Sequence, residues 1–322
     1  MARTVVGVLR GGASSEYELS LKTGAAMMDA LPEEEYDVRD IFIDKQGYWH
    51  SRGVPVDASR ALSQVDVVLN GLHGGAGEDG TVQRILAQSG IPYAGSDAMS
   101  SALSLNKIQA GITLKNAGIQ MPRAVGFTSS SEMNTGEMAK MVFSNFGPPY
   151  IVKPANEGAS VGIRIVATII ELPDAIGDIM DAYGAALVEE YLRGEEATVG
   201  VVDDFRGEEL YVFPPAHVIY PEEAPFLHFE HHTQGEISHM VPSDFTDLEK
   251  TALIDAARAA HRALGLSDFS RADFIVTKRG PYLLEVNSLP GLHEHAAFPH
   301  MLESVGSSVK DFLTHAIHLA RR

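Results

Sequence analysis

The chain has 322 residues, no cysteine and a formal net charge of -18. The absence of cysteine excludes disulfides, thiolate zinc sites and cysteine nucleophiles. The negative charge argues against nucleic acid or an anionic membrane as a partner, since both require a basic face. The apolar stretch at residues 4–9 is too short for a secretory signal, and no apolar run reaches the length of a membrane span. The sequence therefore predicts a cytoplasmic protein.

The first third of the chain alternates strand and helix patterns. Residues 4–9, 37–44 and 65–72 are predicted strands, whereas 19–31 and 80–90 are predicted helices, the second of them stopped by a glycine. This alternation is typical of a parallel sheet with helices on its faces. The functional loops are then expected at the carboxyl ends of the strands, in residues 11–16 and 71–80.

The rest of the chain changes pattern twice. A helical stretch at 96–118 leads to a strand-like pair at 150–166, and a helix at 247–265 leads to a second pair at 270–287 and a terminal helix. There is no internal repeat and no low-complexity linker. We therefore expect three domains from pattern alone, spanning residues 1–97, 98–193 and 194–322.

The stretch at 150–166, YIVKPANEGASVGIRIV, has two apolar runs around a small, glycine-rich loop. Such a hairpin tip, with its backbone N–H groups and Lys153, is suited to lie over phosphates. It is not the phosphate loop that a helix must follow. An ordinary β-hairpin fits the same pattern, so this stretch alone does not decide the ligand.

Acidic residues follow a strand end in the stretch LVEEYLRGEEATVGVV. Glu189 and Glu196 are placed to accept hydrogen bonds from an adenine amino group and a ribose. Solvated surface charge explains the same residues, and on this stretch alone it is the better interpretation.

Two strand-like runs near the end, SRADFIV and YLLEVN, carry oxygen-bearing side chains. Glu285 and Asn287 share one strand face because strand side chains alternate. With Asp273 they offer three hard oxygen ligands, which suit Mg²⁺ completed by substrate phosphates. Arg271 is expected on the same face as Asp273, where it can stabilise developing negative charge. The alternative is an ordinary acidic sheet surface, but Glu285 lies in an apolar context in which an unpaired carboxylate is costly.

Taken together, these stretches resemble the D-alanine–D-alanine ligase family of the ATP-grasp superfamily. The resemblance covers nearly the whole chain, in order, and rests on GGASSEYELS, LNGLHGGAGEDGTVQ, PYAGSDAMSSALSLNK, VKPANEGASVG, EEYLRGEEATV, SRADF and LLEVNSLPG. It implies an α/β, three-domain ATP-grasp fold with an N-terminal parallel-sheet domain. It also implies that a D-amino acid carboxylate attacks the γ-phosphate of ATP, and that a second substrate's amine then attacks the acyl phosphate.

The resemblance assigns roles to particular residues. ATP would be held by Lys107, Lys153, Gly158, Ser160, Glu189, Tyr191, Leu192 and Glu196. Two Mg²⁺ ions, with Mn²⁺ as an alternative, would be bound by Asp273, Glu285 and Asn287. Glu16 would bind the first substrate's ammonium, with His73 near its carboxylate. Arg271 and the Gly291 backbone N–H would stabilise the tetrahedral intermediate. The partners would be small D-amino acids, and the sequence leaves a homodimer open.

The sequence departs from the family pattern at the acceptor end. Ala159 stands where the family loop EGSSVG has its first serine, and the stretch EHHT places His232 and Thr233 where the family has lysine and tyrosine. The family's serine and leucine after the Pro-Gly turn fall at Ala296 and Ala297. The second substrate is therefore open, whereas the reaction type is not.

The histidines allow further interpretations. His228, His231 and His232 have the i, i+3, i+4 spacing that would face one metal ion on a helix, but nothing supplies the supporting partners that a zinc site needs. His293 and His295 either replace the missing acceptor contacts or are solvated.

Three functions are therefore weighed. The first is a D-alanine–D-alanine ligase of peptidoglycan precursor synthesis. The second is the same chemistry with D-lactate, D-serine or another amine as acceptor. The third is an inactive nucleotide-binding regulator, which the intact metal-binding set disfavours. A dinucleotide-dependent oxidoreductase is disfavoured because the first loop lacks the GxGxxG spacing.

Overall fold

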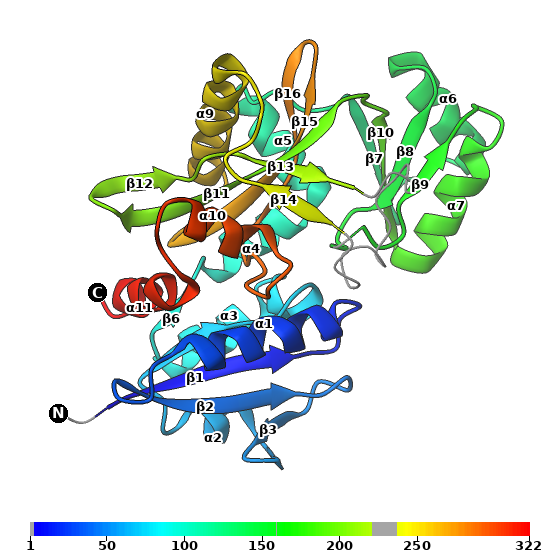
Figure 1. The fold of residues 1–322 in the computed structure, drawn as a ribbon. Helices are drawn as coiled ribbons and strands as arrows, with labels where there is room; N and C mark the ends of the chain where they lie inside the picture. Colours follow the sequence, from blue (N-terminus) through cyan, green and yellow to red (C-terminus); the bar gives the residue numbers. More distant parts are fainter. Residues whose placement is uncertain (1–2, 159, 221–236) are drawn as a thin grey trace.

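The computed structural model describes residues 3–158, 160–220 and 237–322 (Figure 1). Ala159, His232 and Thr233 lie outside the described residues, as do the two other histidines of the zinc alternative, His228 and His231. The roles considered for these positions therefore stay predictions.

An N-terminal sheet is built from the first third of the chain. In spatial order its strands are β4 (Val54–Val56), β3 (Trp49–Ser51), β2 (Tyr36–Ile43), β1 (Thr4–Gly11), β5 (Val67–Asn70) and β6 (Tyr93–Ala94). The last four are parallel to one another, which confirms the predicted parallel sheet. The first two form an antiparallel edge that the alternation of strands and helices did not predict.

Helices cover both faces of this sheet. They are α1 (Tyr17–Ala30), α2 (Ala58–Leu62) and α3 (Thr81–Ser89), with a short 3₁₀ turn η1 (Gly75–Gly77) before α3. Val6 and Val8 of β1 belong to the core that includes α1, whereas Leu9 belongs to the core that includes α2 and α3. This division follows from the alternation of side chains along a strand.

A second sheet lies at the right of Figure 1. Its strands are β7 (Ala124–Thr128), β10 (Ala185–Glu190), β8 (Tyr150–Pro154) and β9 (Arg164–Val166), and its helices are α6 (Thr135–Asn145) and α7 (Leu172–Tyr183). Strands β8 and β9 pair antiparallel, which confirms the hairpin predicted at 150–166.

A third, antiparallel sheet carries the last group of strands. In spatial order they are β14 (Ser238–Met240), β13 (Ala216–Ile219), β11 (Glu195–Phe205), β15 (Phe269–Thr277) and β16 (Gly280–Asn287), with β12 (Glu208–Val212) also paired to β11. Helix α9 (Asp247–Ala263) packs on this sheet. It begins where predicted because the Thr246 and Glu249 side chains cap each other's backbone N–H groups.

Some helices pack against a sheet that belongs to a different predicted domain. The three domain boundaries therefore stay a prediction. Helices α4 (Ala98–Leu105) and α5 (Lys107–Asn116) pack against β16 of the third sheet, although they precede the second sheet in sequence. Helix α10 (Ala297–Ser304) packs on β11, whereas α11 (Val309–Ala320) packs on α1, β5 and β6 of the N-terminal sheet (Figure 1). The N-terminal core is thus completed by the end of the described chain.

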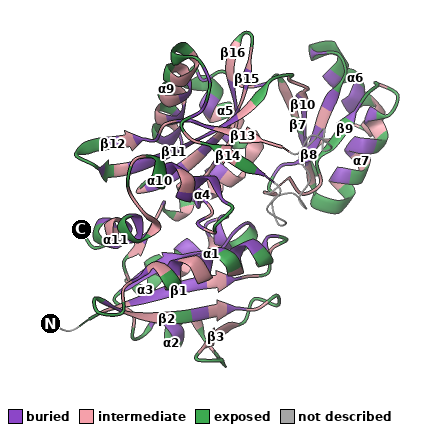
Figure 2. Cartoon of the chain, viewed as in Figure 1, coloured by how far each residue is buried: buried purple, intermediate pink, exposed green. Residues whose placement is uncertain are grey.

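The inner strands of the three sheets are mostly buried, whereas the outer sides of α6 and α7 are exposed (Figure 2). Within the described ranges, no helix combines the length and apolar character that a membrane crossing requires.

The joint between α11 and the N-terminal sheet is expected to support global stability. Phe312 is 1% exposed and lies in the core shared by α11 and β1. Phe312→Ala should lower the free energy of unfolding by about 3–5 kcal/mol, because it removes a large buried ring and leaves a cavity. Chemical denaturation measures this change. The control His318→Ala removes an exposed side chain of the same helix, so equal losses in both variants would contradict the assignment.

Candidate active site

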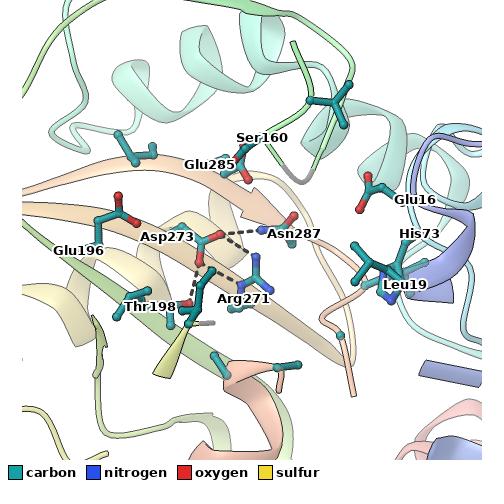
Figure 3. Close-up of a pocket in the computed structure, with 18 of the residues that line it drawn as sticks. Glu16, Leu19, His73, Ser160, Glu196, Thr198, Arg271, Asp273, Glu285 and Asn287 are labelled. Carbon is teal, nitrogen blue, oxygen red and sulfur yellow. Dashed lines mark hydrogen bonds and ion pairs between the residues drawn. The ribbon is translucent and has the colours of Figure 1, made fainter. Parts of the chain in front are cut away.

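A cavity of about 210 Å³ lies where the three sheets approach one another (Figure 3). Predicted residues from all three parts of the chain line it, namely Glu16, His73, Lys107, Lys153, Ser160, Glu196, Arg271, Asp273, Glu285, Asn287, Gly291, His293 and Ala296. A second cavity of about 930 Å³ adjoins it and is lined by Lys153, Glu189, Tyr191, Leu192 and Glu196. The structure thus brings the predicted phosphate, metal and substrate residues together, with the predicted adenine and ribose residues next to them.

A β-bulge shapes the floor of the smaller cavity. Asp273 on β15 pairs with Glu285 on β16, but the next residue, Phe274, pairs with Leu283, so Leu284 is an extra residue. Both Leu283 and Val286 face the hydrophobic core as a result, while Glu285 and Asn287 line the cavity. The shared face of Glu285 and Asn287 is as predicted, whereas strict alternation would have placed Leu283 on that face as well.

Asp273 is held by hydrogen bonds on both carboxylate oxygens (Figure 3). Arg271 donates to it twice, over 3.0 Å from Nε to Oδ1 and 2.8 Å from Nη2 to Oδ2. Asn287 Nδ2 donates to Oδ2 over 2.9 Å, and Thr198 Oγ1 donates to Oδ1 over 2.6 Å. Because the Asn287 NH₂ group donates to Asp273, the amide oxygen of Asn287 is left to face the cavity. The sequence did not single out Thr198, which lies opposite Asp273 in the β11–β15 register.

Glu285 is a buried carboxylate of the floor that neighbouring cations keep ionised. Lys107 Nζ, at the start of α5, lies 3.0 Å from Glu285 Oε2 and also donates to the Glu157 carbonyl oxygen over 2.7 Å. Burial acts to raise the pKa of Glu285, but the cations of Lys107 and Lys153 outweigh burial and lower it to about 2. Asn106 caps α5 and fixes where Lys107 enters the site.

Lys153 forms a second buried ion pair at the border of the two cavities. Its Nζ lies 2.7 Å from Glu189 Oε2, and the two side chains are 6% and 7% exposed. Removing either partner would leave an uncompensated charge. The ammonium has three donors, so the pair leaves Lys153 with further donors for an anionic ligand.

On the opposite wall, Glu16 and Glu78 form no ion pair with a described residue. Burial, followed by the charges of Glu78 and Glu285, raises the pKa of Glu16 to about 8, although Lys107 opposes the shift. Burial also raises the pKa of Glu78 to about 7, although its carboxylate accepts a 2.6 Å hydrogen bond from the Gly74 N–H. The sequence did not single out Glu78, and the motif GEDG was the available signal. A buried carboxylate that is mostly protonated without a cation is suited to receive an ammonium group.

The loop between β8 and β9 reaches across to this wall. A Cβ atom on Gly158 would lie 2.4 Å from Glu16 Oε1, so a larger residue there would displace the Glu16 carboxylate. Ser15 Oγ donates to Glu157 Oε2 over 2.9 Å, and Ser160 adopts a left-handed backbone with φ of 61°. The structure therefore places Gly158 against the predicted donor carboxylate, while its predicted ATP contact stays a prediction.

His73 is neutral at working pH and held in place. Burial lowers its pKa to about 3. Its Nε2 lies 2.8 Å from Thr23 Oγ1, and the Leu292 N–H donates to the same hydroxyl over 3.5 Å. Thr23 thereby connects the histidine to the Pro-Gly turn, where Ala296 packs 3.3 Å from the position of a Cβ on Gly291. Sequence reasoning did not identify Thr23, since a threonine inside a helix gives no signal of its own.

The described residues contain no cluster of three or more His, Asp or Glu side chains arranged around a metal position. The predicted metal set is instead two carboxylates and one amide. Such a set fits Mg²⁺ only when phosphate and water oxygens complete the coordination.

Comparisons with known proteins identify the family. Residues 113–318 match the family model described as D-ala D-ala ligase C-terminus, and residues 5–61 and 50–96 match the model described as D-ala D-ala ligase N-terminus. The chain belongs to the D-alanine–D-alanine ligase family. The D-alanine–D-alanine ligase of Geobacter sulfurreducens is 38% identical to the chain over 319 residues. This alignment covers 96% of the chain and 92% of the relative.

Solved structures of other ligases have the same fold as the chain. VanG D-Ala:D-Ser ligase from Enterococcus faecalis is 29% identical with a TM-score of 0.85, and the match covers 99% of the chain and 100% of that structure. D-alanyl-alanine synthetase A from Vibrio cholerae is 27% identical with a TM-score of 0.86, and the match covers 100% of both. The predicted α/β ATP-grasp fold with an N-terminal parallel sheet is confirmed.

The raised pKa of Glu16 predicts a pH effect on stability. Between its ordinary value of 4.5 and the folded value of about 8, the folded state binds more protons than the unfolded state. Stability therefore falls as pH rises through this window. Glu16→Gln does not titrate, so its stability relative to wild type should rise from pH 5 to pH 8 by up to about 1.4 kcal/mol per pH unit.

Denaturation of the ligand-free protein at several pH values measures this difference. The control Glu18→Gln changes an exposed carboxylate two residues away and should show a flat difference. A flat difference for Glu16→Gln as well would mean that Glu16 is ionised at neutral pH without a substrate ammonium.

Proposed function

We propose that the chain is an ATP-dependent ligase that joins D-alanine to a second D-alanine or a related D-amino acid through an acyl phosphate, with ADP and phosphate as the other products. The observation that carries the proposal is the floor of the smaller cavity. The floor consists of Arg271, Asp273, Glu285 and Asn287. It lies between the wall that carries the buried carboxylates Glu16 and Glu78 and a second cavity large enough for a nucleotide.

The first substrate is held by the N-terminal wall. Glu16 takes the donor's ammonium, which supplies the positive charge that the buried carboxylate lacks. The neutral imidazole of His73 hydrogen-bonds the donor's carboxylate. Because His73 does not carry a charge, the carboxylate oxygen keeps its nucleophilicity toward phosphorus.

ATP lies in the larger cavity with its phosphates toward the floor. Glu189, Tyr191 and Leu192 line the adenine end, with the Leu192 backbone at the adenine edge and Glu196 at the ribose. Lys107 and Lys153 neutralise the phosphates, since each ammonium keeps donors beyond its carboxylate partner. A solved relative supports ATP as the nucleotide: the D-alanine–D-alanine ligase from Bacillus anthracis, 27% identical with a TM-score of 0.80, forms a complex with ATP.

Asp273, Glu285 and Asn287 would hold two Mg²⁺ ions against the phosphates, with Mn²⁺ as an alternative. The ionised state of Glu285 and the cavity-facing amide oxygen of Asn287 fit this role. When bound, the ions neutralise charge that develops on the transferring phosphoryl group. Arg271 fixes Asp273 by two hydrogen bonds, which keeps one ligand in place before the ions bind.

The reaction proceeds in two displacements. The donor carboxylate oxygen forms a bond to the γ-phosphorus of ATP, and ADP leaves. The acceptor amine, after losing a proton, forms a bond to the acyl carbon, and phosphate leaves. Arg271 and the Gly291 N–H stabilise the oxyanion of the tetrahedral intermediate. Enclosure by the loop at Gly158 keeps water from the acyl phosphate.

A second candidate function changes only the acceptor. Ala296 and Ala297 line the cavity after the Pro-Gly turn together with His293 and His295, which leaves room for an acceptor larger than alanine. The similarity to a D-Ala:D-Ser ligase supports D-serine as the alternative. An inactive regulator is disfavoured because the predicted metal ligand Asp273 is held by hydrogen bonds from Arg271, Thr198 and Asn287, which an inactive protein would not need. The cytoplasmic location and the homodimer stay predictions.

The decisive experiment is a screen of initial ADP release. D-alanine, D-serine, D-lactate and the L-enantiomers are tested alone and with D-alanine as donor, and products are identified by mass. We expect release to require a D-amino acid donor and to be fastest with D-alanine or D-serine as acceptor. Release that does not depend on the donor, or no dipeptide product with any pair, would refute the ligase assignment.

Glu285→Gln tests the metal platform. The variant removes a carboxylate ligand and the partner of Lys107, so we expect ADP release to fall by more than about 100-fold. The melting temperature shows whether the fold is retained. The control Glu294→Gln changes an exposed carboxylate beside the Pro-Gly turn and should keep near-normal turnover. Turnover of Glu285→Gln within a few-fold of wild type would exclude Glu285 as a metal ligand.

A further inference from the structure

Tyr220 lies on the wall between the two cavities and is not used in the reaction described above. It follows strand β13 directly and lines both cavities, as does Glu196 of β11. Its hydroxyl donates a hydrogen bond to Glu196 Oε2. Among the described residues, the phenol therefore touches the one carboxylate that lines both cavities.

Glu196 has little backbone freedom. It is paired on one side with Val218 of β13 and on the other with Ile275 of β15, so its backbone is fixed in the middle of the sheet. Only its side-chain torsions remain to be set. The hydrogen bond from Tyr220 sets them, because it anchors the end of the side chain.

The charge around Glu196 makes this anchor important. Asp273 and Glu285 face it from β15 and β16, and both repel a carboxylate. Burial is the largest effect, and together with these charges it raises the pKa of Glu196 to about 7, while the Tyr220 hydroxyl acts to lower it. Without the phenol, Glu196 would turn away from the two carboxylates or take up a proton.

The hydrogen bond leaves half of the carboxylate for a ligand. A carboxylate has two oxygens and about four acceptor sites. Among the described residues, the donor seen at Glu196 is the phenol on Oε2. Oε1 is therefore left to accept a hydroxyl group of a ligand that occupies the larger cavity.

We propose that Tyr220 is a positioning residue for the nucleotide, which orients Glu196 so that it accepts a hydrogen bond from a ribose hydroxyl and makes the site selective for ribonucleotides. The proposal rests on the proposed function in one respect, the placement of ATP in the larger cavity. The phenol acts through Glu196 and does not take part in either displacement.

The test is Tyr220→Phe, which removes only the hydroxyl, with ATP and 2′,3′-dideoxy-ATP as probes. The KM for ATP should rise about 5- to 10-fold, as expected for the net contribution of one typical hydrogen bond. The KM for dideoxy-ATP, the KM for D-alanine and kcat should each change less than about two-fold, because these quantities do not involve the ribose contact. Tyr48→Phe, at a residue 67% exposed, is the matched control.

An ATP KM that is unchanged or lower in Tyr220→Phe would overturn the proposal, since the phenol would then only occupy Glu196 until ATP arrives. An equal rise for ATP and dideoxy-ATP would also overturn it, because the loss would not involve the ribose. Calorimetric titration of ATP and dideoxy-ATP without amino acid measures nucleotide binding alone. It therefore tests the role of Tyr220 even if the ligase assignment fails. Wild-type protein that binds both nucleotides equally would refute the role of Tyr220 whatever the reaction catalysed.

Discussion

The site depends on placing several carboxylates together in a buried cavity and compensating those on the floor locally. Asp273 is the centre of this arrangement, because Arg271, Thr198 and Asn287 all donate to it from three adjacent strands. An antiparallel sheet makes this possible, since its register sets side chains from neighbouring strands opposite one another. The sheet is therefore both the scaffold and the source of the compensating groups.

The remaining carboxylates differ in how completely they are compensated, and this difference divides the cavity by function. Glu285 and Glu189 each have a lysine within 3.0 Å, so they are suited to a region that receives cations and phosphates together. Glu16 and Glu78 have no comparable partner within the described part of the chain, and their raised pKa values mark a region suited to receive a positive charge from a ligand. In a chain with a strong negative net charge, Lys107 and Lys153 thus supply buried positive charge beside these carboxylates.

Much of this architecture was predictable because it follows from local patterns. Alternating strands and helices predicted the parallel sheet, and the Glu-x-Asn spacing predicted the shared face of Glu285 and Asn287. Residues that act through a distant partner could not be predicted. Thr198 contacts Asp273 only through the strand register. Thr23 of α1 contacts His73 in the loop after β5, and Tyr220 contacts Glu196 from just beyond the end of β13. The bulge at Leu284 was likewise invisible, because Leu283 and Leu284 are equally apolar and the pattern does not say which one is extra.

Helix α11 has a consequence for how the chain folds during synthesis. It fills the core of the N-terminal sheet, yet the ribosome makes it after all the strands of the other two sheets. The face of the first sheet that α1 covers therefore emerges only partly covered and must wait for α11, which makes these long-range contacts slow to form. Until then the exposed face is a natural target for chaperones, and an interrupted chain that lacks α11 would be prone to aggregate even though its cavity-lining residues are all present.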